Sequence, residues 1–187
     1  MKNIGVLALQ GDFERHLIKL AACGVKGVEV RDLETLSRAD ALIIPGGEST
    51  ALLKFFDTEG WWEPLKAWAR SHPVMGTCAG AILMAEVVTG PCQPSLNLLP
   101  IAVERNAYGR QVDSFTTDIT DHCLGGGPLP AFFIRAPKIR NIGEGVEVLA
   151  RLDGEPIMVR QGHHLALTFH PELASDLRIH NYFLMLY

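Results

Sequence analysis

Short apolar runs alternate with stretches of helical apolar spacing in the first half of the chain. Uninterrupted apolar runs are typical of strands buried on both faces of a sheet, and they predict strands at 4–9, 28–30, 41–44 and 74–76. Apolar residues at helical spacing predict helices at 13–23, 49–56, 61–71 and 79–88. Ser49 or Thr50 is expected to cap the second of these helices. Strands alternating with helices predict right-handed βαβ units and a mostly parallel sheet.

The second half of the chain predicts strands with little helix between them. The segments concerned are 101–105, 111–119, 131–134, 146–152, 156–161 and 165–169. These strands are expected to extend the sheet or to add an antiparallel layer. Ser175 and Asp176 are expected to cap a final helix that runs to Tyr187. The pattern predicts one α/β sandwich, and the length of 187 residues favours a single domain over 1–187.

Composition and charge narrow the partners and the compartment. A net charge of −4 at pH 7 provides no basic field for nucleic acid. The four cysteines show no C-x-x-C spacing, which favours a reducing cytosol over a disulfide framework. No signal peptide is expected at the N-terminus, and no apolar run approaches the ~20 residues of a membrane span. We therefore expect a soluble, cytoplasmic protein without a membrane or nucleic-acid partner.

Residues 76–80, Gly-Thr-Cys-Ala-Gly, have the form of a nucleophile elbow with cysteine as the nucleophile. In such an elbow a sharp strand-to-helix turn strains the central residue and crowds its neighbours, which explains the glycines two positions before and after Cys78. The turn lifts the sulfur out of the sheet, and the N-terminus of the following helix favours the thiolate. A buried structural cysteine in a Gly-rich turn is the alternative.

His170-Pro171-Glu172 follows the apolar segment 165–169. Ligands and catalytic groups collect where the strands of a parallel sheet end. A histidine there can accept the thiol proton and later donate it to a leaving amine, and a carboxylate two residues away can fix the imidazole tautomer. Taken alone, the tripeptide is more typical of a strand end with a solvated glutamate. Together with Cys78 it supplies a nucleophile, a base and an orienting group.

Residues 45–50, Pro-Gly-Gly-Glu-Ser-Thr, form a Gly-rich turn between a predicted strand and a predicted helix. Their backbone N–H groups can form an oxyanion hole or grip an anion. The segment contains no lysine and Glu48 would repel phosphate, so it is not a Walker loop. The Glu48 carboxylate instead suits a substrate that carries an ammonium group. A plain strand–helix turn is the alternative.

The Gly-Gly turn, the Cys78 elbow and the late His-Pro-Glu segment, in this order, resemble the class I glutamine amidotransferase family. Further segments are similar to the glutaminase subunits of pyridoxal 5′-phosphate synthase: 9–12 (LQGD), 104–106 (ERN), 108–115 (YGRQVDSF), 133–137 (FIRAP) and 169–173 (FHPEL). The sister glutaminase of histidine biosynthesis shares the triad but lacks the ERN, GRQVDSF and FIRAP segments. The resemblance covers essentially the whole chain. It implies a single-domain, three-layer α/β sandwich whose mostly parallel central sheet carries an antiparallel extension.

The resemblance also implies a role for each matching residue. The catalytic triad that hydrolyses L-glutamine to L-glutamate and ammonia would be Cys78, His170 and Glu172. Glutamine would be bound by Gly47, Glu48, Ser49, Arg105, Ile134 and Arg135. The backbone N–H groups of Gly47 and Ala79 would form the oxyanion hole, and Gln10 would lie where the partner docks. That partner would be the synthase subunit of a pyridoxal 5′-phosphate synthase hetero-oligomer, and no cofactor is expected in this chain.

Two alternatives stay open at this point. The chain could be the glutaminase subunit of another synthase, such as imidazole glycerol phosphate synthase. It could also be a non-catalytic redox or stress sensor built on the Cys78 elbow, although a sensor would have no use for His170 and Glu172. The other histidines lack the spacing of metal ligands, so no metal site is expected. His163 and His164, close to the last predicted strand, are the one histidine pair that merits attention.

Overall fold

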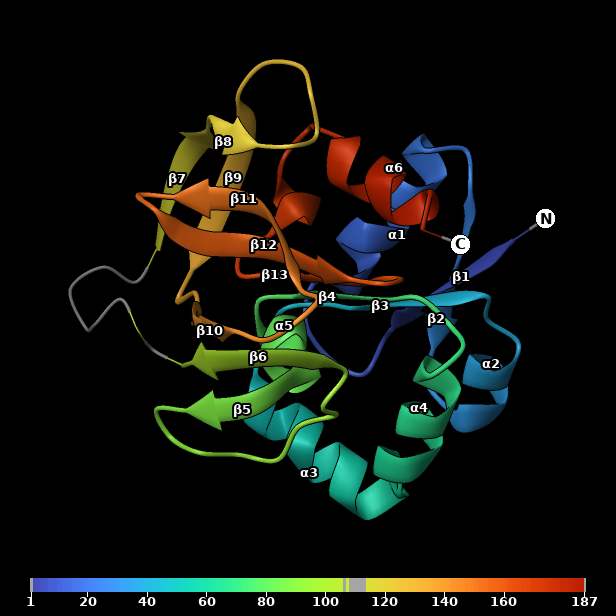
Figure 1. The fold of residues 1–187 in the computed structure, drawn as a ribbon. Helices are drawn as coiled ribbons and strands as arrows, with labels where there is room; N and C mark the ends of the chain where they lie inside the picture. The colour runs from blue at the N-terminus through green and yellow to red at the C-terminus, as the bar shows by residue number, and fades with distance from the viewer. Residues whose placement is uncertain (1, 106, 108–113, 187) are drawn as a thin grey trace.

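The computed structural model describes residues 2–105, 107 and 114–186, and its elements form three layers (Figure 1). The middle layer is an eight-stranded sheet in the order β2-β1-β3-β4-β13-β12-β11-β8. Its strands are β1 (Asn3–Leu7), β2 (Lys26–Val30), β3 (Ala41–Ile44), β4 (Val74–Thr77), β8 (Asp121–His122), β11 (Glu147–Leu152), β12 (Glu155–Gln161) and β13 (His164–Leu167). Neighbours are parallel from β2 to β13 and antiparallel from β13 to β8. The predicted fold class is confirmed.

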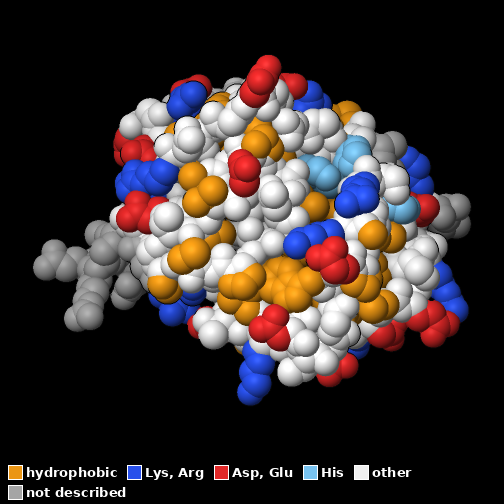
Figure 2. All heavy atoms as spheres, turned by 60° about the horizontal axis from the view of Figure 1, so that its bottom comes forward, with side chains coloured by type: hydrophobic (Ala, Val, Ile, Leu, Met, Phe, Trp, Pro, Cys, Tyr) orange, Lys and Arg blue, Asp and Glu red, His pale blue; other side chains and the backbone are white. Residues whose placement is uncertain are grey.

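Helices and a small second sheet cover one face of the central sheet (Figure 1). The helices are α2 (Leu33–Ser37), α3 (Ser49–Glu59), α4 (Trp62–Ala69) and α5 (Ala79–Met84), and the strands are β5 (Ala85–Thr89), β6 (Leu99–Glu104) and β10 (Lys138–Ile142). Leu42 and Ile44 of β3 pack in this layer with Phe56 and Leu65. Figure 2 shows the α3–α4 side of the molecule, where apolar side chains gather between charged ones.

The opposite face carries α1 (Phe13–Ala22), α6 (Arg178–Leu184) and the two-stranded sheet of β7 (Ser114–Ile119) and β9 (Leu129–Ile134). Ala41 and Ile43 of β3 pack in this layer with Leu20 and Phe183. Successive residues of β3 thus enter opposite cores, because side chains alternate across a strand. That burial on both faces explains the uninterrupted apolar run of this segment.

Several predicted boundaries are wrong. The helix predicted at 79–88 ends at Met84, and the residues after it form β5, which pairs with β6. The change of structure coincides with Val87 and Val88, because β-branched side chains favour strands. The final helix begins at Arg178 with Leu177 as N-cap, while Asp176 Oδ1 accepts the Arg178 backbone N–H at 2.8 Å. The short elements α2, β8 and β10 were not predicted.

Candidate active site

Cys78 joins the end of β4 to the start of α5, with φ 49° and ψ −104°. Residues other than glycine rarely adopt positive φ, so this backbone is strained. The Cys78 N–H donates to the carbonyl oxygen of Leu167 in β13 at 2.8 Å. A Cβ on Gly80 would lie 2.1 Å from the Ile44 carbonyl oxygen, and one on Gly76 would lie 2.6 Å from the Gly80 backbone. The strain and crowding predicted for the elbow are confirmed.

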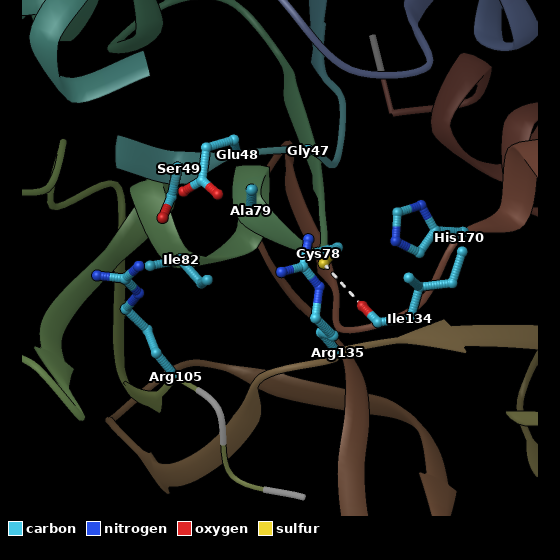
Figure 3. A pocket seen from close by; sticks show the side chains of 10 residues that line it. All are labelled: Gly47, Glu48, Ser49, Cys78, Ala79, Ile82, Arg105, Ile134, Arg135 and His170. Atoms are coloured by element: carbon cyan, nitrogen blue, oxygen red, sulfur yellow. Dashed lines mark hydrogen bonds between the residues drawn. The ribbon is translucent and has the colours of Figure 1, made fainter. Parts of the chain in front are cut away.

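His170 and Glu172 form a buried pair just after β13. His170 Nδ1 lies 2.7 Å from Glu172 Oε1. An ionised carboxylate only accepts hydrogen bonds, so Nδ1 carries a proton and Nε2 is the nitrogen left for proton exchange. Figure 3 shows the His170 ring and the Cys78 sulfur at one pocket. Within the described residues Nε2 has no hydrogen-bond partner, and Cys78 Sγ lies 3.8 Å from the Ile134 carbonyl oxygen.

Burial and neighbouring charges set the ionisation of this pair. Burial acts to lower the pKa of His170, but its interactions with Cys78 and Glu172 outweigh burial and raise the pKa to about 10. Burial acts to raise the pKa of Glu172, but His16 and His170 hold it below its usual value. Glu172 is therefore a carboxylate at neutral pH, and it favours the imidazolium form of His170.

The pocket beside Cys78 collects residues from both halves of the chain (Figure 3). It is lined by Gly47, Glu48, Ser49, Cys78, Ala79, Ile82, Arg105, Ile134, Arg135 and His170. The lining includes every residue expected to hold the substrate or to form the oxyanion hole. Sequence reasoning missed Ile82, which lies four residues after Cys78 in α5. Residues at that spacing share a helix face, and this was the available signal.

Gln10 and the Gly-rich turn contact each other directly. Gln10 Oε1 accepts the backbone N–H of Glu48 at 2.6 Å. Gly47 has φ 144°, and a Cβ there would lie 2.2 Å from Gln10 Oε1, so both conformation and space require glycine. The predicted cap is wrong, because Glu48 rather than Ser49 or Thr50 is the N-cap of α3. Its side chain accepts the Thr50 N–H at 3.2 Å, and this bond is the main cause that lowers the Glu48 pKa.

Other predicted features lie outside this pocket or outside the described residues. Residues 106 and 108–113 of the ERN and YGRQVDSF segments belong to the part that the structure does not describe. His163 and His164 are not in the pocket lining. Over 2–105, 107 and 114–186, no group of three or more His, Cys, Asp or Glu side chains is arranged to hold a metal ion. No helix in the same ranges is long and apolar enough to cross a membrane.

Comparison with known proteins assigns the chain to a family. The sequence model of the SNO glutamine amidotransferase family matches residues 6–186. The chain belongs to that family. A protein of Pelotomaculum thermopropionicum named pyridoxal 5′-phosphate synthase subunit PdxT is 54% identical over 97% of this chain and 93% of its own length. The protein of the same name from Solibacter usitatus is 49% identical over 98% of each chain.

Solved structures agree with this membership. A crystal structure described as a glutamine amidotransferase superposes with a TM-score of 0.90 at 49% identity, over 98% of this chain and 97% of that one. The PurLQS structure from Thermotoga maritima, at 16% identity and a TM-score of 0.69, shares the fold alone. The similarity to glutamine amidotransferases expected from the sequence is thus confirmed.

Proposed function

We propose that this chain, as one domain over 1–187, hydrolyses L-glutamine to L-glutamate and ammonia for a pyridoxal 5′-phosphate synthase. The observation that best supports this proposal is the 2.7 Å contact between His170 Nδ1 and Glu172 Oε1, because His170 lines the same pocket as Cys78, whose backbone is strained. The identity of 49–54% to pyridoxal 5′-phosphate synthase subunits over nearly the whole chain supports the choice of pathway.

The first half-reaction forms a thioester and releases ammonia. The Cys78 thiolate attacks the side-chain amide carbon of glutamine, so a C–S bond forms and the carbonyl oxygen becomes an oxyanion. Backbone N–H groups of Gly47 and Ala79 stabilise that oxyanion. The imidazolium of His170 then donates its Nε2 proton to the amide nitrogen, the C–N bond breaks and ammonia leaves.

The second half-reaction restores the cysteine. Neutral His170 now accepts a proton from water as the water oxygen attacks the thioester carbon. The C–S bond breaks, glutamate leaves and the thiolate is regenerated beside the imidazolium. Glu172 holds the same tautomer of His170 through both halves, so one nitrogen donates and then accepts the proton.

Charged side chains of the pocket match the two ends of the amino acid. Glu48, whose pKa lies below its usual value, is ionised and binds the α-ammonium group. Arg105 and Arg135 line the same pocket and bind the α-carboxylate. Figure 3 shows these three side chains around the cavity with Ser49 and Ile134 beside them. The side-chain amide of glutamine then points toward Cys78.

The partner is the synthase subunit, with which this cytoplasmic chain forms a hetero-oligomer. The test mixes the purified chain and glutamine with the synthase subunit of pyridoxal 5′-phosphate synthase or with that of imidazole glycerol phosphate synthase, and measures ammonia. We expect strong glutamine hydrolysis only with the first partner, accompanied by pyridoxal 5′-phosphate from a pentose phosphate and a triose phosphate. Activation by the second partner alone would show that the chain supplies ammonia to imidazole glycerol phosphate synthase instead. No ammonia with either would favour the non-catalytic sensor.

A further inference from the structure

Two buried histidines, His16 and His180, extend the row of polar contacts that runs from His170 to Glu172. His16 of α1 has its Nε2 3.3 Å from Glu172 Oε2, the carboxylate oxygen that His170 does not occupy. On its other side, His16 Nδ1 lies 3.1 Å from Nε2 of His180 in α6. Both histidines have no solvent exposure, and Glu172 is 2% exposed. Helices from the two ends of the chain therefore meet at the triad carboxylate.

Burial disfavours the charged form of both histidines. Burial lowers the pKa of His16, although the Glu172 charge acts in the opposite direction. Burial is also the main cause that lowers the pKa of His180, to about 3. A neutral imidazole has one N–H donor and one bare nitrogen, so each contact in the row must have one donor and one acceptor.

One arrangement of the ring protons avoids placing two acceptors opposite each other along these contacts. If His16 carried its proton on Nδ1, its bare Nε2 would face a carboxylate oxygen, and two acceptors would oppose each other in a buried place. With the proton on Nε2, His16 presents the positive end of an N–H dipole 3.3 Å from Glu172 Oε2 and accepts at Nδ1 from Nε2–H of His180. Two atoms at these contacts are left without a hydrogen-bond partner among the described residues: His180 Nδ1, and Glu172 Oε2, whose contact with His16 is electrostatic and lacks hydrogen-bond alignment. A bare nitrogen on His180 costs less than an unpartnered N–H.

We propose that His16 is a positioning residue of the triad: its Nε2–H attracts the second oxygen of Glu172 electrostatically, and His180 fixes the tautomer of His16 that makes this possible. The inference rests on the proposed glutaminase function. Attraction at the second oxygen restrains Glu172 from rotating away from His170, so the His170 Nε2 stays directed at Cys78 throughout turnover. Small errors in such alignment reduce turnover more than binding.

The same nitrogen also lies near the Gly-rich turn. Thr77 Oγ1 is 3.5 Å from His16 Nε2 and accepts the backbone N–H of Gly46 at 3.0 Å. Thr77 directly precedes Cys78 and is completely buried. His16 thus touches both the carboxylate that orients the base and the hydroxyl that anchors the turn beside the oxyanion site.

Three substitutions at one position separate positioning from packing. His16→Leu removes the donor. His16→Gln places an amide N–H near the former Nε2 and so still reaches Glu172, whereas His16→Asn places it near Nδ1, facing His180. The matched control is Leu20→Ala, one turn along the same helix, because Leu20 is fully buried but makes no polar contact with the triad. Each variant is assayed for glutamine hydrolysis with the activating synthase subunit, and its thermal melt is recorded.

We expect kcat to fall about 10- to 100-fold in His16→Leu and His16→Asn, with KM for glutamine within about twofold of wild type. His16→Gln should recover most of kcat, and Leu20→Ala should melt earlier yet keep its kcat at temperatures where it is folded. Equal kcat in the Gln and Asn variants would overturn the inference even if the Leu variant does not fold. A kcat loss in Leu20→Ala as large as in His16→Leu would also overturn it. Absence of hydrolysis by the wild type, in contrast, would reject the proposed function itself.

Discussion

The carboxylate of Glu172 is shared between two histidines, with Oε1 2.7 Å from His170 Nδ1 and Oε2 3.3 Å from His16 Nε2. Removing its charge should therefore affect the base more than the substrate pocket, which Glu172 does not line. We expect Glu172→Gln to lower kcat strongly, with about 10⁴-fold as an upper limit taken from the corresponding exchange in a serine protease triad.

The measurement is steady-state glutamine hydrolysis with the synthase subunit, together with calorimetric binding of glutamine. Binding should change little, since the carboxylate acts mainly in the transition state. A large loss of affinity with unchanged kcat would make Glu172 a substrate contact instead.

Gln10 should matter for activation by the partner. Its Oε1 accepts the Glu48 N–H, so the peptide after Gly47 is fixed by a residue three positions after the end of β1. We expect the isolated chain to hydrolyse glutamine weakly and the synthase subunit to activate it several-fold or more. Gln10→Ala should reduce that activation while shifting the melting temperature only slightly.

The control for this prediction is Gln161→Ala, the same change at a side chain that donates to the Glu144 carbonyl and does not line the pocket. Ammonia release is compared with and without the synthase for both variants. Full activity of the wild-type chain without its partner would refute activation by the synthase subunit and leave the triad assignment standing.

The elbow glycine Gly80 should not tolerate a methyl group. A Cβ there would lie 2.1 Å from the Ile44 carbonyl oxygen, a backbone atom that cannot give way as the end of a flexible side chain could. We expect Gly80→Ala to reduce the free energy of unfolding by about 1–3 kcal/mol or more. Gly127→Ala, where a Cβ meets no atom within 4 Å, should change it by less than about 0.5 kcal/mol. Urea unfolding curves of the two variants that coincide would contradict the packing account.

His180 should contribute to loss of stability in acid. Its pKa is lowered to about 3 in the fold by burial and His16, against about 6.5 in the unfolded chain. The unfolded state therefore binds more protons between these values, and stability present above pH 6.5 is lost as pH falls. At pH 5 the loss should be about 2 kcal/mol from this residue. His180→Gln should flatten the acid side of the stability curve, measured by urea unfolding from pH 4.5 to 7.5. An unchanged slope would show that His180 is not the titrating group.

The sequence predicted those parts of the structure whose signals are local. The apolar run of β3 and the spacing in α1 specify their elements without help from distant residues. The Gly-Thr-Cys-Ala-Gly segment specifies a strained turn because only small residues fit beside Cys78. The elements that were missed or misplaced are short, or they form only because they pair with a distant strand. An example is β5, which begins at Ala85, directly after α5, and pairs with β6.

In the active site, too, the sequence predicted the residues with local signals and missed those defined by long-range contacts. Residues with a motif of their own, such as His170, were predicted, and the pocket assembles them. His16 carried no signal, because its significance comes from a contact with Glu172 across 156 positions of the chain. The contacts of α1 with residues 171–173 and of His16 with His180 bring the two histidines to the triad carboxylate. Long-range contacts of this kind leave no spacing that a single sequence can reveal.

The most direct test of the account is ammonia release from glutamine by the Cys78→Ala chain in the presence of the activating synthase subunit. Cys78 contributes a sulfur at the pocket rather than a large share of the core, so the variant should fold and still bind its partner. We expect ammonia no higher than in a mock preparation, while the wild-type chain, assayed alongside, hydrolyses glutamine. Substantial hydrolysis by purified, folded Cys78→Ala would contradict the assignment of the nucleophile, and with it the mechanism.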